Sequence, residues 1–263
     1  METAVLKLGN VPVNVKSITV FFADGSKSAC EYEKTHKKGK YDVFRFRCED
    51  ALVDLYVVAE GKSCVLGFSI VSPKTLDADF PLEICLSADK PNKVLALTTH
   101  KDVGNFYSNA FGYYPPIAID REPRGPKPSD APEYPSPIKS IKHEEFMRGY
   151  PCWSYPIFSK DFESIPHYSI FLLAECKNKY LALFSFTDGS TTTYVNPELK
   201  LKVFVGKNVK TIGLSWIASI TVDEDPYKAV ENCVKAASSY AVFKPREMKK
   251  TPIIMEKFGW CSW

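Results

Sequence analysis

Short runs of β-branched and aromatic residues recur along most of this chain. In several runs apolar and polar side chains alternate, as in VFRFR at positions 43–47. A period of two is typical of a half-buried antiparallel strand, which turns one face to the core and the other to solvent. The regular spacing of the runs predicts a β-sandwich.

Turn residues separate the expected strands at DGS 24–26, KKGK 37–40, EGKS 60–63, DKPN 89–92, KNK 177–179 and DGS 188–190. We expect strands within 13–22, 42–48, 51–60, 63–71, 80–88, 93–100, 169–176, 179–187, 191–195, 199–205 and 211–222. The basic stretch HKKGK at 36–40 is interpreted as a solvated loop or hairpin turn, because it is short and contains a glycine.

Residues 115–137 interrupt this pattern with eight of the chain's 19 prolines. Proline fixes φ and removes a backbone donor, so this stretch is expected to be an extended excursion rather than a strand or helix. Two interpretations remain open. It is a surface linker between two sheets, or a loop that reaches toward a ligand site.

The period changes to that of a helix after residue 225. Asp225 is a natural N-cap, and Pro226 suits the first helical position. The carboxylates of Asp223, Glu224 and Asp225 complement the helix dipole. The expected apolar stripe comprises Tyr227, Val230, Val234 and Ala237, with Ala229 and Cys233 beside it.

Composition and charge exclude several classes of function. The net charge of +3 gives no reason to expect nucleic acid or a membrane as a partner. The N-terminus lacks the pattern of a signal peptide, and no apolar run reaches the roughly 18 residues of a membrane span, so a cytoplasmic location is expected. The eight cysteines are scattered without metal-ligand spacing and are expected to be mostly buried, reduced thiols. No motif for a cofactor, a metal or a serine or cysteine triad is found.

Several segments of the second half resemble one enzyme family. FGWCSW at 258–263 is similar to F-G-W-C-T-W-D, the segment that opens the catalytic barrel in the raffinose synthase and seed imbibition protein branch of the α-galactosidases, glycoside hydrolase family 36. DEDPYKAVENCVKAA at 223–237 resembles the D-D-P-F/Y helix before that barrel. LALFSFTDGSTTTYV at 181–195 is similar to the L-P-L-x-D-G-x-F-R strand pair.

Two more segments carry the resemblance with departures. PCW at 151–153 resembles the family's C-W-W segment, with Ser154 in place of the second tryptophan. IPHYSIFLLAEC at 165–176 is similar to I-P-x-E-T-Q-F-L-L-x-E, and its residues 167–169 depart from E-T-Q. The resemblance covers about residues 150–263, whereas the first 110 residues match in strand pattern alone.

The resemblance implies an all-β fold, a large antiparallel β-supersandwich, followed by one helix and the first strand of a (β/α)8 barrel that is absent from these 263 residues. The expected domains are the supersandwich at 1–222, helix and linker at 223–256, and the barrel strand at 257–263. Retaining glycoside hydrolysis needs two carboxylates about 5–5.5 Å apart on a rigid scaffold. The family's two catalytic aspartates would therefore lie beyond Trp263, and no catalytic residue is assigned in this chain.

The candidate substrate-binding residues are Trp263 and Trp153. By resemblance Trp263 lines the pocket for a terminal galactose, since an indole ring offers a flat surface to the C–H face of a sugar. The alternative for each is packing at a domain junction. Trp260 is expected to pack the barrel against the sandwich, and Trp216 to lie in the core.

Two functions follow as hypotheses. In the first, the chain is the N-terminal sandwich of an α-galactosidase-like or raffinose-synthase-like retaining enzyme, inactive alone, whose substrate is a galactose-containing oligosaccharide. In the second, it is a non-catalytic carbohydrate-binding or scaffolding sandwich that docks a separate barrel chain.

Overall fold

The computed structural model describes residues 5–8, 11–98, 117–118, 155–163, 165, 169–189, 191–241 and 243–250. Trp153, Trp260, Trp263, the expected barrel strand at 257–263 and nearly all of the proline-rich stretch lie outside these residues.

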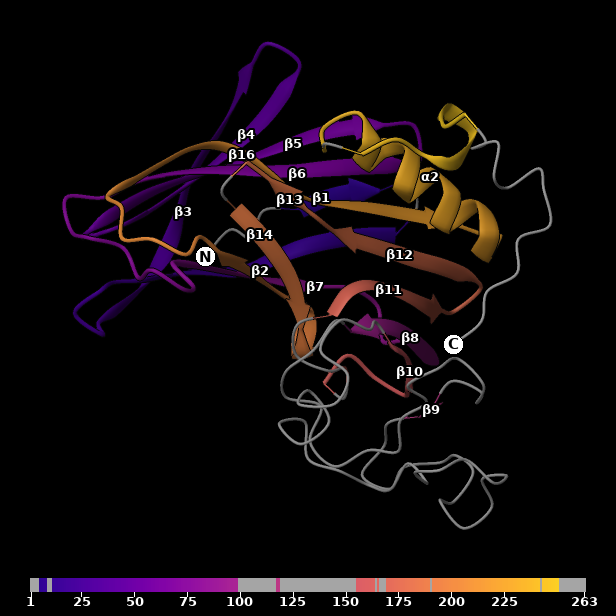
Figure 1. The fold of residues 1–263 in the computed structure, drawn as a ribbon. Helices are drawn as coiled ribbons and strands as arrows, with labels where there is room; N and C mark the ends of the chain where they lie inside the picture. Colours follow the sequence, from indigo (N-terminus) through magenta and orange to yellow (C-terminus); the bar gives the residue numbers. More distant parts are fainter. Residues whose placement is uncertain are drawn as a thin grey trace, which may run out of the picture.

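Sixteen strands form one sheet in the described residues (Figure 1). The strands are β1 (Val5–Leu8), β2 (Val11–Phe21), β3 (Lys27–Lys38), β4 (Tyr41–Cys48), β5 (Ala51–Glu60), β6 (Ser63–Val71), β7 (Leu82–Ser87), β8 (Lys93–Thr98), β9 (Ile117–Ala118), β10 (Tyr155–Ser159), β11 (Ser169–Cys176), β12 (Lys179–Ser185), β13 (Thr187–Asp188), β14 (Thr191–Asn196), β15 (Lys200–Phe204) and β16 (Thr211–Asp223). Most of the strands expected from the alternating pattern are confirmed, and the bounds of β5, β6 and β11 match the sequence runs.

The sheet runs in the order β13-β14-β15-β7-β2-β3-β4-β5-β6-β16-β12-β11-β8-β10-β9, with β1 paired to β2. An additional pairing of β14 with β11 joins two distant members of this path, so the sheet closes on itself in a barrel-like arrangement. All the pairings are antiparallel except that of β10 with β9. The expectation of an antiparallel all-β fold is therefore confirmed, with one continuous sheet supplying both layers.

Tight turns join the long hairpins where the sequence predicts them. Gly39 links β3 to β4 and Gly61 links β5 to β6, each with φ of 61°. This left-handed conformation is readily adopted by glycine, which has no Cβ. The expected hairpin turn in HKKGK is confirmed at Gly39 and Lys40, whereas its first three residues form the end of β3, with Lys37 and Lys38 exposed.

The core lies on the inner face of the closed sheet. Side chains from strands far apart in sequence meet there, among them Ile18, Leu55, Phe68, Leu82 and Leu183, each at most 1% exposed. Burying one such side chain stabilises the fold by about 1.5–3 kcal/mol relative to leaving it in water. The core therefore supplies the main favourable term for closing the sheet.

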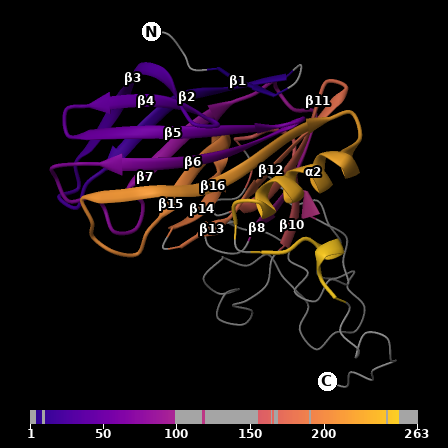
Figure 2. The ribbon, with the colours of Figure 1, turned by 90° about the horizontal axis from the view of Figure 1, so that it is seen from above.

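One α-helix, α2 (Pro226–Ser238), lies across the outer face of the sheet, over β16, β12 and β6 (Figure 2). Asp225 caps it as expected. Its carboxylate Oδ1 accepts hydrogen bonds from the backbone N–H groups of Tyr227 at 2.8 Å and Lys228 at 3.2 Å.

The expected apolar stripe of this helix is corrected in part. Tyr227 is 84% exposed, and the buried face comprises Ala229, Cys233, Ala236 and Ala237. Small side chains allow the helix backbone to lie close to the sheet, whereas the large Tyr227 ring on the first turn faces solvent. The buried face of α2 is therefore rotated away from Tyr227 and toward the small residues.

Strand β3 was not expected from the sequence. Its burial pattern leaves eight of its 12 residues exposed, so the apolar alternation that marks the other strands is missing. β3 pairs with β2 only over Lys27–Cys30 and then continues against β4 alone. Its charged residues, including Glu31, Lys34 and Lys37, are typical of a protected sheet edge.

The six cysteines of the described residues are free thiols, and five of them are buried. Cys48 is the half-buried one. Among the helices of the described residues, none combines the length and the apolar character that crossing a bilayer requires.

Replacing Asp225 with alanine removes the acceptor for two backbone N–H groups at the start of α2. We expect Asp225→Ala to lower the free energy of unfolding by about 0.5–2 kcal/mol, measured by urea denaturation. Asp225→Asn should retain most of the stability, because asparagine is an equally good N-cap. Exposed Glu224→Ala is the matched control, and an equal loss there would contradict the assignment.

Candidate functional site

The structure does not describe the two predicted sugar-binding residues, Trp153 and Trp263, and therefore brings neither to a site. The described tryptophan, Trp216, lies in β16 and is half-buried on the outer face of the sheet. The expectation that it belongs to the inner core is corrected. Ser215 and Ile217, the residues on either side, are buried. Ile217 belongs to the main core cluster, whereas the indole of Trp216 packs against the cluster beneath α2, so these two side chains lie on opposite faces of the sheet.

Two irregularities in β16 set the position of Trp216. The register of β16 against β6 shifts between Ile212 and Ser215, and again between Trp216 and Ala218. Such bulges leave a backbone group without a ladder partner and increase the local twist. The backbone N–H of Trp216 donates instead to the carboxylate Oδ2 of Asp188, at 2.8 Å.

Asp188 belongs to the Asp-Gly turn between β13 and β14. Its backbone carbonyl accepts a hydrogen bond from the hydroxyl of Thr191 at 3.0 Å, and Thr191 also contacts the hydroxyl of Ser215. The turn is thus fastened to β16 through both its backbone and its side chain. This explains why an aspartate suits the position, since a carboxylate reaches an N–H that the ladder leaves unpaired.

The indole of Trp216 lies against Gly67 of β6, its direct cross-strand partner. A Cβ at position 67 would lie 2.7 Å from the ring carbon Cε3 and 3.1 Å from the carbonyl oxygen of Ser215. Real Cβ atoms almost never approach this closely. Only glycine therefore leaves room for the ring to lie flat across the strand.

Trp216 is the centre of an aromatic cluster that also contains Tyr41, Tyr56 and Tyr240. Ring centroids lie 4.5 Å apart for Trp216 and Tyr240, 5.6 Å for Trp216 and Tyr41, and 6.1 Å for Tyr41 and Tyr56. Tilted and edge-on pairs at these distances add about 0.5–1.5 kcal/mol each beyond area burial. The cluster thereby fixes Tyr240, which follows the C-cap of α2, to the sheet.

Polar groups at the rim complete the attachment of Tyr240. Its hydroxyl donates to Glu60 Oε1 at 2.9 Å and accepts from Lys40 Nζ at 3.1 Å. Burial raises the pKa of the Tyr240 phenol, and the hydrogen bond to Tyr240 raises the pKa of Lys40. The phenol is therefore protonated at neutral pH and can donate to Glu60.

The other end of α2 is held by a second polar contact. Lys62, in the turn between β5 and β6, donates to Asp223 Oδ2 at 3.0 Å, and the backbone N–H of Asp225 donates to Asp223 Oδ1 at 3.2 Å. The hydrogen bond from Lys62 is the main cause of the lowered pKa of Asp223. Of the three adjacent acidic residues, Asp223 thus forms the buried contact with the sheet and Asp225 the cap.

The described residues do not present the groups of a glycosidase centre. A general acid requires a carboxyl whose pKa is raised, whereas the described carboxyls with a shifted pKa, Asp24, Glu33 and Asp223, are all lowered. In the same residues, no group of three or more His, Cys, Asp or Glu side chains is placed to hold a metal ion. The arrangement around Trp216 is suited to attachment and positioning.

Residues 174–263 match the family model described as raffinose synthase or seed imbibition protein Sip1. The resemblance to the raffinose synthase family is confirmed. A galactinol–sucrose galactosyltransferase of Pisum sativum is 27% identical over 140 residues, which are 48% of this chain and 17% of the relative. A probable galactinol–sucrose galactosyltransferase 4 of Arabidopsis thaliana is 29% identical over 92 residues, 33% of this chain and 10% of the relative.

The raffinose synthase match contains half of the aromatic cluster, together with Asp188 and Asp223. Asp188, Trp216, Asp223 and Tyr240 lie within residues 174–263. Their partners Gly67, Tyr41 and Lys40 come from the part of the chain before the match. Sequence reasoning placed Trp216 in the core and missed its role in this cluster, because the bulges change the phase of β16 and its pairing with Gly67 joins strands far apart in the sequence.

Enlarging Gly67 should displace the Trp216 ring. We expect Gly67→Ala to lower the free energy of unfolding by about 1–3 kcal/mol through overpacking, measured by urea denaturation followed by tryptophan fluorescence. In a Trp216→Ala background the same substitution should cost less, because the clash with the ring is gone and only the 3.1 Å approach to the Ser215 carbonyl remains. Gly213→Ala is the matched control, since a Cβ there meets nothing within 4 Å. Equal losses at positions 67 and 213 would rule out the proposed contact.

The contact between Lys62 and Asp223 should make stability depend on pH. The folded-state pKa of Asp223 is lowered, so its contribution is present above the unfolded value of about 3.9 and is lost as the pH falls through the folded value. We expect Asp223→Asn to be less stable than the parent chain at pH 7, with a difference that shrinks below about pH 4. Unfolding free energies of both proteins between pH 7 and pH 3 test this, and a difference that does not change with pH would contradict it.

Proposed function

We propose that this chain is the β-sandwich part of a retaining enzyme that acts on α-galactosides, and that it has no glycosidase activity by itself. The two catalytic aspartates would belong to a (β/α)8 barrel outside these 263 residues, and the reaction would be a double displacement through a covalent glycosyl intermediate. The observation that carries the proposal is the family match, which runs through β12, β16 and α2 to residue 263.

The proposed substrate class is a galactose-containing oligosaccharide. Both reported relatives are named galactinol–sucrose galactosyltransferases, and the chain spans less than a fifth of each in the matched stretch. Hydrolysis and transfer share the same glycosyl-enzyme intermediate and differ only in the acceptor. The proposal therefore covers both outcomes.

The proposed domain division assigns residues 1–222 to the sandwich, 223–256 to the helix and linker, and 257–263 to the first barrel strand. The helix α2 supports this division because both its ends are fixed to the sheet, by Asp223 and by Tyr240. The chain that follows Tyr240 thus starts from a defined place. In the complete enzyme this attachment would orient the segment that carries Trp263, the proposed galactose contact.

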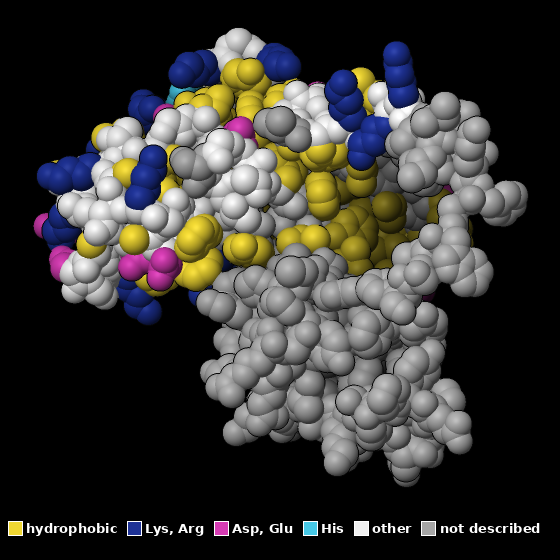
Figure 3. All heavy atoms as spheres, in the orientation of Figure 1, with side chains coloured by type: hydrophobic (Ala, Val, Ile, Leu, Met, Phe, Trp, Pro, Cys, Tyr) yellow, Lys and Arg dark blue, Asp and Glu magenta, His cyan; other side chains and the backbone are white. Residues whose placement is uncertain are grey.

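An apolar surface beside α2 supports the docking of a further domain. The outer faces of β8, β11 and β12 carry the half-buried side chains of Leu97, Leu173, Tyr180 and Phe184. Figure 3 shows hydrophobic side chains gathered over β12 and β11 next to α2. Surfaces of this kind are typical of contacts between domains. We propose that the barrel, in the same chain or as a separate one, packs against this side of the sandwich.

A second function, a free-standing carbohydrate-binding module, is favoured by one observation. Trp216 is half-buried on an outer sheet face, with Lys40 and Glu60 at the rim of its cluster. Sugars bind to flat aromatic rings flanked by hydrogen-bonding groups. Tyr240 lies 4.5 Å from the indole, however, and this contact better explains the ring as an anchor for the chain after α2.

The purified chain is expected to release no p-nitrophenol from p-nitrophenyl α-galactoside above the rate in buffer, because the proposal places both catalytic aspartates outside these 263 residues. An active α-galactosidase is the positive control for the assay. Release that rises in proportion to the concentration of the chain, and persists after repeated purification, would overturn the proposal.

Titration of the chain with galactinol, followed by tryptophan fluorescence, separates the two functions. The enzyme-part proposal expects no saturable change. A saturable change that disappears in Trp216→Phe and persists in Trp260→Phe would establish the carbohydrate-binding module instead.

A further inference from the structure

Two cysteines face each other across β3 and β4. The register places Glu31 opposite Arg47, so the next pair along the same ladder is Cys30 and Cys48. Residues directly opposite in an antiparallel pair have Cα atoms about 4.5–5.5 Å apart. Disulfides span Cα separations of about 4.4–6.8 Å. A Cα separation in this range would allow a bond between the two sulfur atoms.

The two thiols are free and follow the Glu31–Arg47 pair at the end of the β3–β4 ladder. Cys30 is buried in the main core, and Cys48 is half-buried and packs against the same core. Burial, followed by the hydrogen bond to Cys48, raises the pKa of Cys30. Cys30 is thus kept as an uncharged thiol, which is compatible with a reduced pair in the resting protein.

An open cavity of about 620 Å³ gives access to one member of the pair. Cys48 is part of its wall, together with Tyr32, Arg47 and three glutamates, Glu31, Glu33 and Glu49. A small disulfide can enter a space of this size and reach the half-buried Cys48. Cys64 and Cys233, by contrast, are buried at 1% and 0% exposure.

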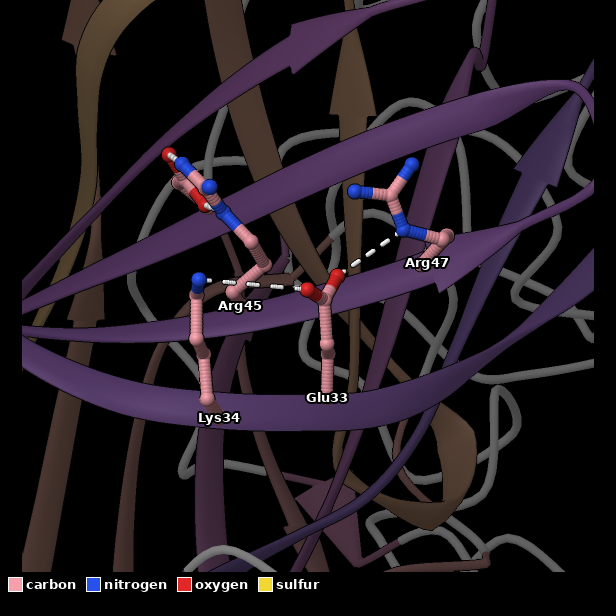
Figure 4. A network of polar contacts seen from close by, with 5 residues as sticks. Glu33, Lys34, Arg45 and Arg47 are labelled. Carbon is pink, nitrogen blue, oxygen red and sulfur yellow. Dashed lines mark hydrogen bonds and ion pairs between the residues drawn. The ribbon is translucent and has the colours of Figure 1, made fainter.

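An ionic contact joins β3 to β4 close to the two cysteines, and neighbouring ion pairs surround it (Figure 4). Arg47 donates to Glu33 at 2.9 Å, and Lys34 lies 4.0 Å from the same carboxylate. Arg45 binds both oxygens of Asp54 on β5, at 2.7 and 2.8 Å. A slip of β3 against β4 by one residue would break the contact between Arg47 and Glu33 and turn the two cysteines to opposite faces.

We propose that Cys30 and Cys48 are a redox-active pair that forms a reversible disulfide by exchange with a small-molecule disulfide such as oxidised glutathione. The Cys48 thiolate attacks a sulfur of the oxidant, giving a mixed disulfide and releasing one glutathione thiol. The Cys30 sulfur, on losing its proton, attacks Cys48 Sγ and releases the second glutathione thiol. Two protein thiols are oxidised and one glutathione disulfide is reduced.

The bond would fasten β3 to β4 at the point where β3 leaves β2. Beyond Cys30 the strand pairs with β4 alone, so a covalent link there restricts opening of the whole protruding hairpin. Closing a loop covalently lowers the entropy of the unfolded chain and stabilises the folded one. The oxidised form would therefore differ from the reduced form in the mobility of this hairpin.

The test is native oxidation of the full chain in mixtures of oxidised and reduced glutathione, followed by alkylation of free thiols and peptide mapping by mass spectrometry. We expect a peptide containing Cys30 to be linked to one containing Cys48, with a mass lower by two hydrogen atoms and full reversal by dithiothreitol. Cys64 and Cys233 should become alkylated only after denaturation.

Two variants sharpen the result. Cys30→Ser should retain glutathione on Cys48, because the resolving thiol is missing, and Cys85→Ala should leave the linked peptide unchanged. The proposal is overturned if the native chain yields no Cys30–Cys48 link at any glutathione ratio. It is equally overturned if the link forms only in denaturant.

Discussion

The inner faces of all the long strands meet around one apolar core, and this shared burial is the constraint on which the fold depends. Ile18 from β2, Phe68 from β6 and Leu183 from β12 belong to the same cluster although they are far apart along the chain. Their side chains reach each other only if the sheet curves and closes. The pairing of β14 with β11 closes the sheet, because it joins two strands that are distant in the strand order.

Much of the strand pattern was predictable because the inner face is continuous and apolar. β5 and β6 were located from the sequence because they are rich in apolar residues typical of strands and lie between turn residues, and most of their side chains are buried. β3 was missed because beyond Cys30 it lies at an edge and carries charges on both faces. Trp216 was expected in the core but is half-buried on the outer face, because bulges alter the period of two in β16. A bulge depends on a distant partner such as Asp188, which local periodicity does not reveal.

The helix α2 likewise depends partly on nearby residues in the sequence and partly on distant strands. Its start at Asp225 and Pro226 is encoded locally and was predicted correctly. The face that it buries is chosen by the sheet beneath it, which accepts alanine and cysteine and excludes the Tyr227 ring. The predicted sugar contacts Trp153 and Trp263 remain predictions, because they lie outside the described residues.

The pairing of β6 with β16 also has a consequence for the time course of synthesis. The hydroxyls of Ser63 and Thr221 meet at 2.6 Å across a sequence separation of 158 residues. At translation rates of about 5–20 residues per second, β6 is made about 8–30 s before the strand that completes it. During that interval one edge of β6 has no native partner strand. The nascent chain can therefore close its sheet only after β16 has been synthesised.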